Sequence, residues 1–380
     1  MKFLIIASSV PSILNFRGEL LLALQEAGFE IHIAAPEFTS YPAELEKLHS
    51  LGYKVHNIFM QRTGTNPAAD AQTFLALYRL MRDIKPDYMM GYTIKPVIYG
   101  LLAAKFAHVP HRFALITGLG FAFQGVDEQG YRKSHLQKIM HKLYSLALVS
   151  THKIFFQNPD DEALFKSMGI VKPTASTKVV NGSGVDLSEY SVQPFHTVDD
   201  SPIPRFLLIA RLLVDKGIRE YAQAARLIKI KYPQVQFDLV GPFDSNPSAI
   251  SQIELDTWLE EELFTYWGRV SDVRPAILAN SIYVLPSYRE GTPRSVLEAM
   301  AMGRPIITTD APGCRETVIN GYNGYIVPVK AVDELAAAME RFIVDPKLIV
   351  QMGAASRQLV EDKFDVHAVN QVMLKEMDIL

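Results

Sequence analysis

The sequence predicts an α/β protein made of two doubly wound domains that face an interdomain cleft. Three observations support this prediction. Short apolar runs alternate with amphipathic helical patterns, as expected for parallel sheets that helices cover on both faces. The alternation stops in the polar stretch 191–204, which contains three prolines, and then restarts. A length of 380 residues suits two domains of ordinary size.

The first domain is predicted over residues 1–195, where strand-like runs and helical patterns follow one another regularly. In its first helix, Gly28 suits the C-cap because glycine readily adopts a positive φ. Its strands are predicted at residues 2–8, 30–36, 53–59, 86–92, 112–117 and 152–157, and its helices at 16–29, 42–50, 71–83, 97–107 and 132–150.

The second domain is predicted over residues 205–362, after an interdomain linker at 191–204. One helix is expected to have Thr292 as N-cap, Pro293 as first residue and Gly303 as terminator, since these residue types favour those positions. Two helical segments are expected to close the chain. Strands are predicted at 205–210, 235–241, 263–268, 281–287, 305–310 and 324–328.

Composition argues against several classes of function. A net charge of −3 gives no support for nucleic-acid binding, and the single cysteine, Cys314, excludes an internal disulfide and a cysteine metal cluster. No run of 18 apolar residues is present, so a transmembrane helix is not expected. We interpret the short apolar start as a buried strand rather than a signal peptide, which predicts a cytoplasmic protein.

Two glutamates, Glu290 and Glu298, lie on either side of the predicted helix start at Pro293. The first amides of a helix lack intrahelical partners and carry positive partial charge, so this start suits a diphosphate. Glu298 can accept hydrogen bonds from two ribose hydroxyls, and Glu290 can contact a sugar. The alternative is structural: Glu298 as a good helix former and Glu290 as a solvated loop residue.

Two cations, Arg211 and Lys216, follow the first strand of the second domain, at the end where parallel sheets bind ligands. Fixed cations there can neutralise the diphosphate of a departing nucleotide. Cations in a loop are also commonly just solvated.

Four segments in this order resemble the retaining glycosyltransferases of family GT4: Arg211-x4-Lys216, "GRVSDV", "PSYREGTPRSVLEAMA" and "GYNGYIVP". The resemblance covers the whole second domain and implies the GT-B fold, with two Rossmann-like domains. It also implies that a C-terminal helix within 363–380 crosses back to the first domain.

The resemblance implies roles for the residues of these segments. Arg211, Lys216 and Glu290 would be catalytic, the two cations binding the donor diphosphate. Glu298 would bind the ribose of a UDP-sugar. The donor would also be bound by Gly291, Thr292 and Pro293 at the helix start and by Arg269 and Val270 beside the base.

The first domain is implied to bind the acceptor. Arg17 is a candidate for an acceptor phosphate, against the alternative of a solvated arginine at a helix start. Gly118 and Gly120, in "TGLG", follow a strand and allow close approach to a ligand. Without a third glycine, this element does not match a dinucleotide fingerprint, which disfavours a dehydrogenase. Many GT4 enzymes have a histidine in this region, which is not found here.

The segments "AAKFAHVPHRFALITGLG", "VVNGSGVDL" and "LPSYREG" are most similar to GT4 α-1,3-N-acetylgalactosaminyltransferases that act on undecaprenyl-diphospho-sugars. This similarity implies transfer of an N-acetylhexosamine, such as GalNAc, to a polyprenyl-diphospho-saccharide during assembly of O-antigen, capsule or protein-linked glycans. The basic, amphipathic stretch 131–150 would then contact the inner face of the plasma membrane, although a solvated helix face explains it too.

No cofactor is expected, and transfer is expected to be independent of metal, because no Asp-x-Asp follows a strand and the cations and helix start can replace a metal's charge. Two other functions stay open. One is a UDP-sugar 2-epimerase of the same fold, which would need additional acid/base groups near the sugar. The other is a two-lobed ligand-binding protein, which would need export.

Overall fold

The computed structural model describes residues 1–61, 64, 66–119, 123, 134–199, 201–244, 246 and 248–380. They form two compact units, one of residues 1–183 with 367–380 and one of residues 184–366. None of the helices in these ranges is both long and apolar enough to cross a membrane.

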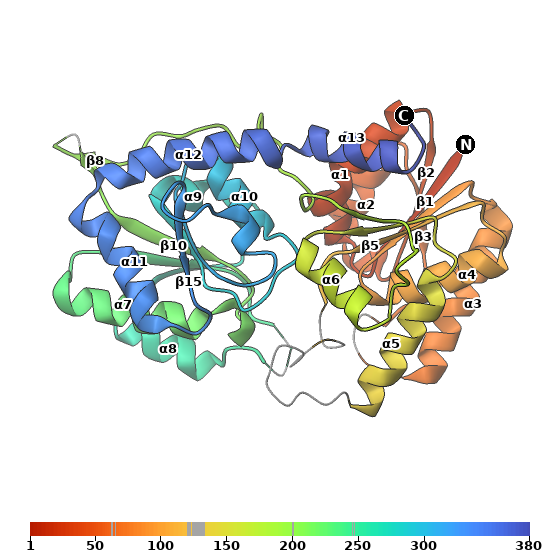
Figure 1. The fold of residues 1–380 in the computed structure, drawn as a ribbon, viewed down its shortest axis with the longest axis horizontal. Helices are drawn as coiled ribbons and strands as arrows, with labels where there is room; N and C mark the ends of the chain where they lie inside the picture. The colour runs from red at the N-terminus through yellow and green to blue at the C-terminus, as the bar shows by residue number, and fades with distance from the viewer. Residues whose placement is uncertain are drawn as a thin grey trace. The chain divides into compact units, whose positions relative to one another are not determined.

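The first unit contains a parallel sheet (Figure 1). Its strand order is β3-β2-β1-β4-β5-β6-β7. Residues of β1 alternate between its two faces: Phe3 and Ile5 pack in one core, and Leu4 and Ile6 in the other. The strands are β1 (Lys2–Ile6), β2 (Glu30–Ala35), β3 (Lys54–Asn57), β4 (Tyr88–Tyr92), β5 (His111–Ile116), β6 (Lys153–Phe156) and β7 (Thr177–Val179). The helices are α1 (Pro11–Glu26), α2 (Pro42–Ser50), α3 (Pro67–Ile84), α4 (Leu101–Phe106), α5 (His135–Leu148), α6 (Pro159–Ser167) and α13 (Val366–Glu376), with short turns η1 (Phe38–Ser40) and η2 (Pro96–Gly100).

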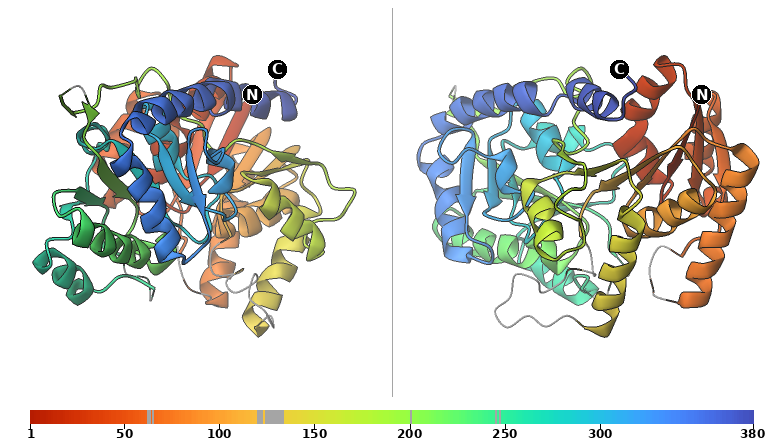
Figure 2. Two further views of the ribbon diagram at one scale, coloured as in Figure 1. Left: turned by 60° about the vertical axis from the view of Figure 1, so that its left-hand side comes forward. Right: turned by 45° about the vertical axis from the view of Figure 1, so that its right-hand side comes forward.

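The second unit contains a parallel sheet in the order β12-β11-β10-β13-β14-β15, again with helices on both faces (Figures 1 and 2). Phe206 and Leu208 of the central strand pack in one core, and Leu207 in the other. The strands are β10 (Arg205–Ile209), β11 (Gln236–Val240), β12 (Thr265–Gly268), β13 (Ile282–Leu285), β14 (Ile306–Thr309) and β15 (Gly324–Val327). The helices are α7 (Ile218–Lys231), α8 (Gln252–Glu260), α9 (Arg274–Ala279), α10 (Arg294–Ala301), α11 (Val332–Val344) and α12 (Lys347–Lys363), with short turns η4 (Val214–Lys216) and η5 (Arg315–Thr317).

The predicted helix 97–107 begins with a π-helical turn, η2, before it becomes α4. Gly91 of β4 explains the close packing of this turn, because a Cβ at residue 91 would lie 2.6 Å from the carbonyl oxygen of Pro96. The turn therefore lies against the sheet at a distance that only glycine allows.

Three helices follow β15, not the two segments predicted. Pro346 separates α11 from α12, since proline disfavours a helical conformation in the residue before it. The last helix, α13, belongs to the first unit, where Met373, Leu374 and Met377 pack in the core on one face of its sheet.

The stretch 191–204, predicted to be a linker, lies within the second unit and contains the short hairpin β8 (Thr197–Val198) and β9 (Ser201–Pro202). The buried side chain of Arg304 holds its first part. The guanidinium donates to the carbonyl oxygens of Gln193 and Pro194 at 2.8 and 3.3 Å, and lies 4.6 Å from the ring centroid of Phe195. Its polar composition and prolines predicted a linker, but a buried arginine binds its backbone.

Arg304→Ala is expected to destabilise the second unit by about 3 kcal/mol or more. The guanidinium also donates to the buried carbonyl oxygens of Ile277 and Met302, and a buried carbonyl that loses its donor costs roughly 1–3 kcal/mol. The measurement is urea unfolding followed by fluorescence. Arg341→Ala, at an exposed arginine beside Tyr325, is the control and should change the free energy of unfolding by less than about 0.5 kcal/mol. Equal stability of the two variants would contradict the role of Arg304.

Candidate active site

Most of the predicted site residues of the second unit follow the two central strands, β10 and β13, where the strand order reverses. Arg211 and Lys216 come after β10, and Glu290 and Glu298 come after β13. Open parallel sheets bind ligands at such a switch point, beyond the carboxyl ends of the strands.

The loops after β10 and β13 are joined to each other by their backbones. The carbonyl oxygen of Asp215 accepts hydrogen bonds from the Tyr288 amide and the Ser287 hydroxyl, at 2.9 and 3.0 Å. Gly217 follows with a φ of +72°, and a Cβ there would lie 2.1 Å from the carbonyl oxygen of Pro286. Glycine at this position therefore allows the contact that brings Lys216 to the other loop.

Lys216 and Glu290 form an ion pair, with 2.5 Å between Nζ and Oε1. Both side chains are largely buried, at 14% and 16% exposure. The Glu290 amide donates to the Pro312 carbonyl at 2.9 Å, and Gly313 lets the two loops touch, since a Cβ there would lie 2.3 Å from the Glu290 carbonyl oxygen. The structure thus brings together two of the three residues predicted to be catalytic, and neither is a freely solvated loop residue.

The third, Arg211, pairs with Asp244 at 2.6 Å and is about half exposed. Asp244 lies in the loop after β11 and belongs to no recognisable motif, so it was not predicted from the sequence. Two cations predicted to act together thus have different carboxylate partners.

The helix start differs by one residue from the prediction. Pro293 is the N-cap, with φ −72° and ψ 111°, and α10 begins at Arg294. The extended conformation of Pro293 keeps it outside the helix, so Thr292 does not occupy the capping position. Gly291, Thr292 and Pro293 are buried at this start, and Gly303, with φ +77°, follows the helix end as predicted.

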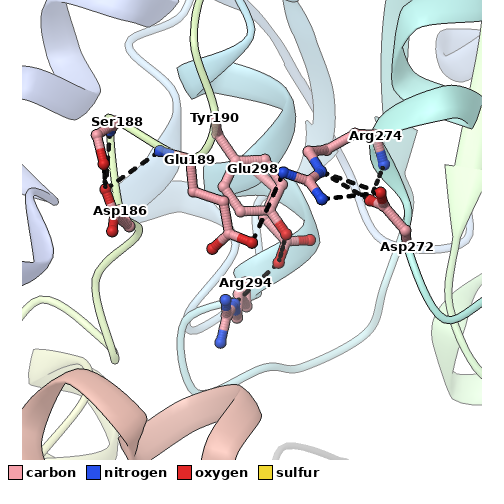
Figure 3. A network of polar contacts seen from close by, with 8 residues as sticks. All are labelled: Asp186, Ser188, Glu189, Tyr190, Asp272, Arg274, Arg294 and Glu298. Atoms are coloured by element: carbon pink, nitrogen blue, oxygen red, sulfur yellow. Dashed lines mark hydrogen bonds and ion pairs between the residues drawn. The ribbon is translucent and has the colours of Figure 1, made fainter.

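Glu298 lies one turn into α10 and is only 8% exposed (Figure 3). Its Oε1 accepts hydrogen bonds from the Tyr190 hydroxyl at 3.1 Å and from Arg294 Nε at 2.8 Å. Burial raises the pKa of Glu298, while the charge of Arg294 and the Tyr190 hydrogen bond act in the opposite direction. Neither partner was predicted from the sequence, where only the i,i+4 spacing from Arg294 to Glu298 indicated one of them.

The loop after β12 reaches the same network through Arg274 (Figure 3). Arg274 Nε binds Asp272 at 2.9 Å, its guanidinium lies 5.9 Å from the Tyr190 ring centroid, and a second nitrogen lies 3.7 Å from Glu189. Two residues expected to border a base, Arg269 and Val270, begin this loop; the arginine is exposed and the valine packs partly against a core. A cavity of about 260 Å³ between α7 and α8 is lined by none of the predicted residues.

In the first unit, Arg17 lies in α1, the helix that connects β1 with β2, and is 3% exposed. Its guanidinium is 5.5 Å from the Tyr92 ring centroid, and the Tyr92 hydroxyl is 2.9 Å from Ser12 Oγ. Burial raises the pKa of Tyr92 to about 12. A solvated arginine at the helix start is therefore the wrong description, because this residue is buried beside Tyr92, at the end of β4.

Gly118 follows β5 with a φ of +151°, and among the described residues no atom lies within 4 Å of the position that its Cβ would take. This open space is compatible with close approach of a ligand. Gly120 lies outside the described residues, as do residues 131–133 of the predicted basic stretch.

Family comparisons decide the class of protein. Residues 203–345 match the family model of glycosyl transferases group 1, and residues 8–158 match that of glycosyl transferase 4-like proteins. The chain belongs to these glycosyltransferases. Its relatives are transferases too, which favours this activity over an epimerase or a binding protein.

Two relatives resemble this glycosyltransferase over most of its length. The N,N'-diacetylbacillosaminyl-diphospho-undecaprenol alpha-1,3-N-acetylgalactosaminyltransferase of Campylobacter jejuni is 29% identical, over 100% of this chain and 98% of the relative. The UDP-Gal:alpha-D-GlcNAc-diphosphoundecaprenol alpha-1,3-galactosyltransferase of Escherichia coli is 27% identical, over 78% and 76%. Among solved structures, sucrose-phosphate synthase from Thermosynechococcus elongatus superposes with a TM-score of 0.80 at 19% identity, over 99% and 98% of the two chains, consistent with the GT-B fold.

Proposed function

We propose that this glycosyltransferase moves an N-acetylhexosamine, such as GalNAc, from a UDP-sugar to an undecaprenyl-diphospho-saccharide, with retention of configuration. The observation that carries the proposal is the Lys216–Glu290 pair at the switch point of the second unit, next to the start of α10. The names of the two relatives support the acceptor class, and that of the Escherichia coli enzyme supports UDP as the nucleotide.

In this proposal the donor lies along the carboxyl edge of the second sheet. Lys216 and Arg211 bind the diphosphate, together with the backbone of Gly291 and Thr292 and the start of α10. Glu298 accepts hydrogen bonds from the ribose, and the loop that begins with Arg269 and Val270 borders the base. These fixed charges take the place of a metal ion, so transfer does not require one.

The chemical step breaks the bond between the anomeric carbon and the phosphate oxygen. The acceptor hydroxyl forms the new bond on the same face, and its proton passes to the departing phosphate. Negative charge grows on the diphosphate as the bond breaks, so Lys216 stabilises the transition state more than the ground state. Glu290, released from Lys216 by the diphosphate, accepts hydrogen bonds from the sugar hydroxyls.

The first unit binds the acceptor in this proposal. Arg17 and the open backbone at Gly118 lie beyond the carboxyl ends of its strands, where the acceptor diphosphate would bind. Lys138 and Lys142 are exposed on α5, together with Ile139 and Leu146, each 56% exposed. A basic face with exposed apolar side chains suits an anionic lipid surface, where a polyprenyl acceptor resides.

The deciding experiment supplies the purified protein with UDP- and GDP-sugars, with and without a polyprenyl-diphospho-sugar, and measures released nucleotide. We expect release to require both UDP-N-acetylhexosamine and the lipid acceptor, and to persist in EDTA. Acceptor-independent release, or release from GDP-sugars alone, would contradict the proposal.

Replacing both Lys138 and Lys142 with glutamate is expected to weaken binding to anionic vesicles by about 10-fold or more, since each basic residue near such a surface contributes about 1 kcal/mol. Flotation with phosphatidylglycerol vesicles measures it. Lys47→Glu with Lys172→Glu changes the net charge equally at exposed lysines of the same unit, and should leave flotation unchanged. Equal loss in both double variants would indicate a general charge effect instead of contact through α5.

A further inference from the structure

The two hydrogen bonds of the Glu298 carboxylate both end on one oxygen, Oε1 (Figure 3). Within the described part of the chain, Oε2 accepts no hydrogen bond. A carboxylate held through one oxygen has a fixed plane, and its second oxygen remains available to a ligand. Tyr190 and Arg294, the two donors to Oε1, set the orientation of the Glu298 carboxylate.

Tyr190 is itself held firmly. Its amide donates to the Asp186 carbonyl at 3.0 Å, and its carbonyl accepts from Arg357 Nη1 at 3.0 Å. The Asp186 side chain shapes the preceding turn by accepting from the amides of Ser188 and Glu189, at 2.8 and 3.2 Å. Only 7% of Tyr190 is exposed, so its hydroxyl has a defined position relative to α10.

The charged and titratable groups around Glu298 come from several elements. Arg294 belongs to the same helix, Tyr190 and Glu189 to the preceding turn, and Tyr283 to β13. Burial, followed by the charge of Glu298, raises the pKa of Tyr190, so its hydroxyl keeps its proton at neutral pH and donates. Arg294 adds a charged donor that is 23% exposed, whereas Tyr190 approaches from the buried side.

We infer that Tyr190 is a positioning residue for donor recognition: it fixes Glu298 through Oε1, so that Oε2 faces the ribose hydroxyls of the nucleotide. This inference rests on the proposed function, because it assumes that Glu298 binds ribose. Arg274, which lies over the Tyr190 ring, connects this tyrosine to the loop that borders the base. Tyr190 thus supports both the glutamate that binds the ribose and the loop that borders the base.

The test compares UDP with 2′,3′-dideoxy-UDP, which lacks both ribose hydroxyls, by titration calorimetry on the full chain. Wild type should bind UDP about 10-fold or more tightly than the dideoxy nucleotide, as hydrogen bonds to a charged group imply. Tyr190→Phe should reduce this preference about fivefold or more, through weaker binding of UDP, with the affinity for dideoxy-UDP unchanged within about twofold.

Tyr232→Phe is the matched control, because the Tyr232 hydroxyl also donates to a glutamate, Glu340 of α11, at 2.7 Å, away from the candidate site. It should keep the wild-type preference. The inference is overturned if Tyr190→Phe keeps that preference, or if it weakens both nucleotides equally, as a purely structural role would. Wild type that binds UDP but does not discriminate overturns the inference and the ribose role of Glu298, and leaves the proposed transfer from a UDP-sugar standing. Wild type that binds no UDP overturns the proposed function as well.

Discussion

Lys216→Ala is expected to lower turnover by about 10²–10³-fold, because it removes a fixed donor to the charge that develops on the leaving diphosphate. The KM for the UDP-sugar should change much less than turnover, since the lost interaction is strongest in the transition state. Steady-state release of UDP at saturating lipid acceptor measures both quantities.

The matched control is Lys153→Ala. Lys153 pairs with Glu376 at 2.5 Å in the first unit, the same distance as in the Lys216–Glu290 pair, and its replacement should leave turnover within about twofold. Lys216→Ala also removes the lysine that pairs with Glu290, and a largely buried carboxylate that loses this lysine can lower stability. The double variant Lys216→Ala, Glu290→Gln should therefore regain stability but not activity. If Lys216→Ala kept wild-type turnover, Lys216 would have no role in the chemical step.

Glu298→Gln is expected to weaken binding of the UDP-sugar by roughly 100-fold, because two hydrogen bonds from ribose to a carboxylate become bonds to a neutral amide. Turnover at saturating donor should fall far less. Equilibrium binding of the UDP-sugar without acceptor is the measurement, and Glu254→Gln, at an exposed pair with Arg219, is the control.

The pH dependence of this binding provides an independent check. Because burial raises the pKa of Glu298, the carboxylate gains a proton at a higher pH than an exposed glutamate would. Affinity for the UDP-sugar should therefore be full at high pH and decline as the pH falls through that raised pKa. In Glu298→Gln the profile should be flat over the same range, and a matching decline in the variant would assign the titration to another group.

The architecture follows from local patterns. Most strands of both sheets are short apolar runs, and Gly303 follows the end of the helix after β13 as its sequence suggests. These features depend on neighbours in the chain, so periodicity and capping preferences can reveal them. The edge strand β7, with the sequence Thr-Lys-Val, has no such pattern and was not predicted. The π-helical turn after β4 depends instead on a glycine in a strand, and no helical pattern indicates it.

The site was predictable only in part, for a related reason. The loops that carry Lys216 and Glu290 were recognisable as segments, but their ion pair joins residues 74 positions apart. The contact between Tyr190 and Glu298 spans 108 positions and comes from a turn without periodic structure. Such pairings result from packing between loops, and residue types along one chain do not specify them.

The ion pair between Lys216 and Glu290 has a further consequence for the catalytic cycle. An empty site that contains its own counter-charge attracts a lone anion only weakly, because binding must first separate the two side chains. Under the proposed function, an intact nucleotide-sugar compensates both, its diphosphate meeting the lysine and its hydroxyls the glutamate. Once the sugar has been transferred, Glu290 competes with UDP for Lys216. The same contact that discriminates against inorganic phosphate before the reaction thus assists departure of the spent nucleotide after it.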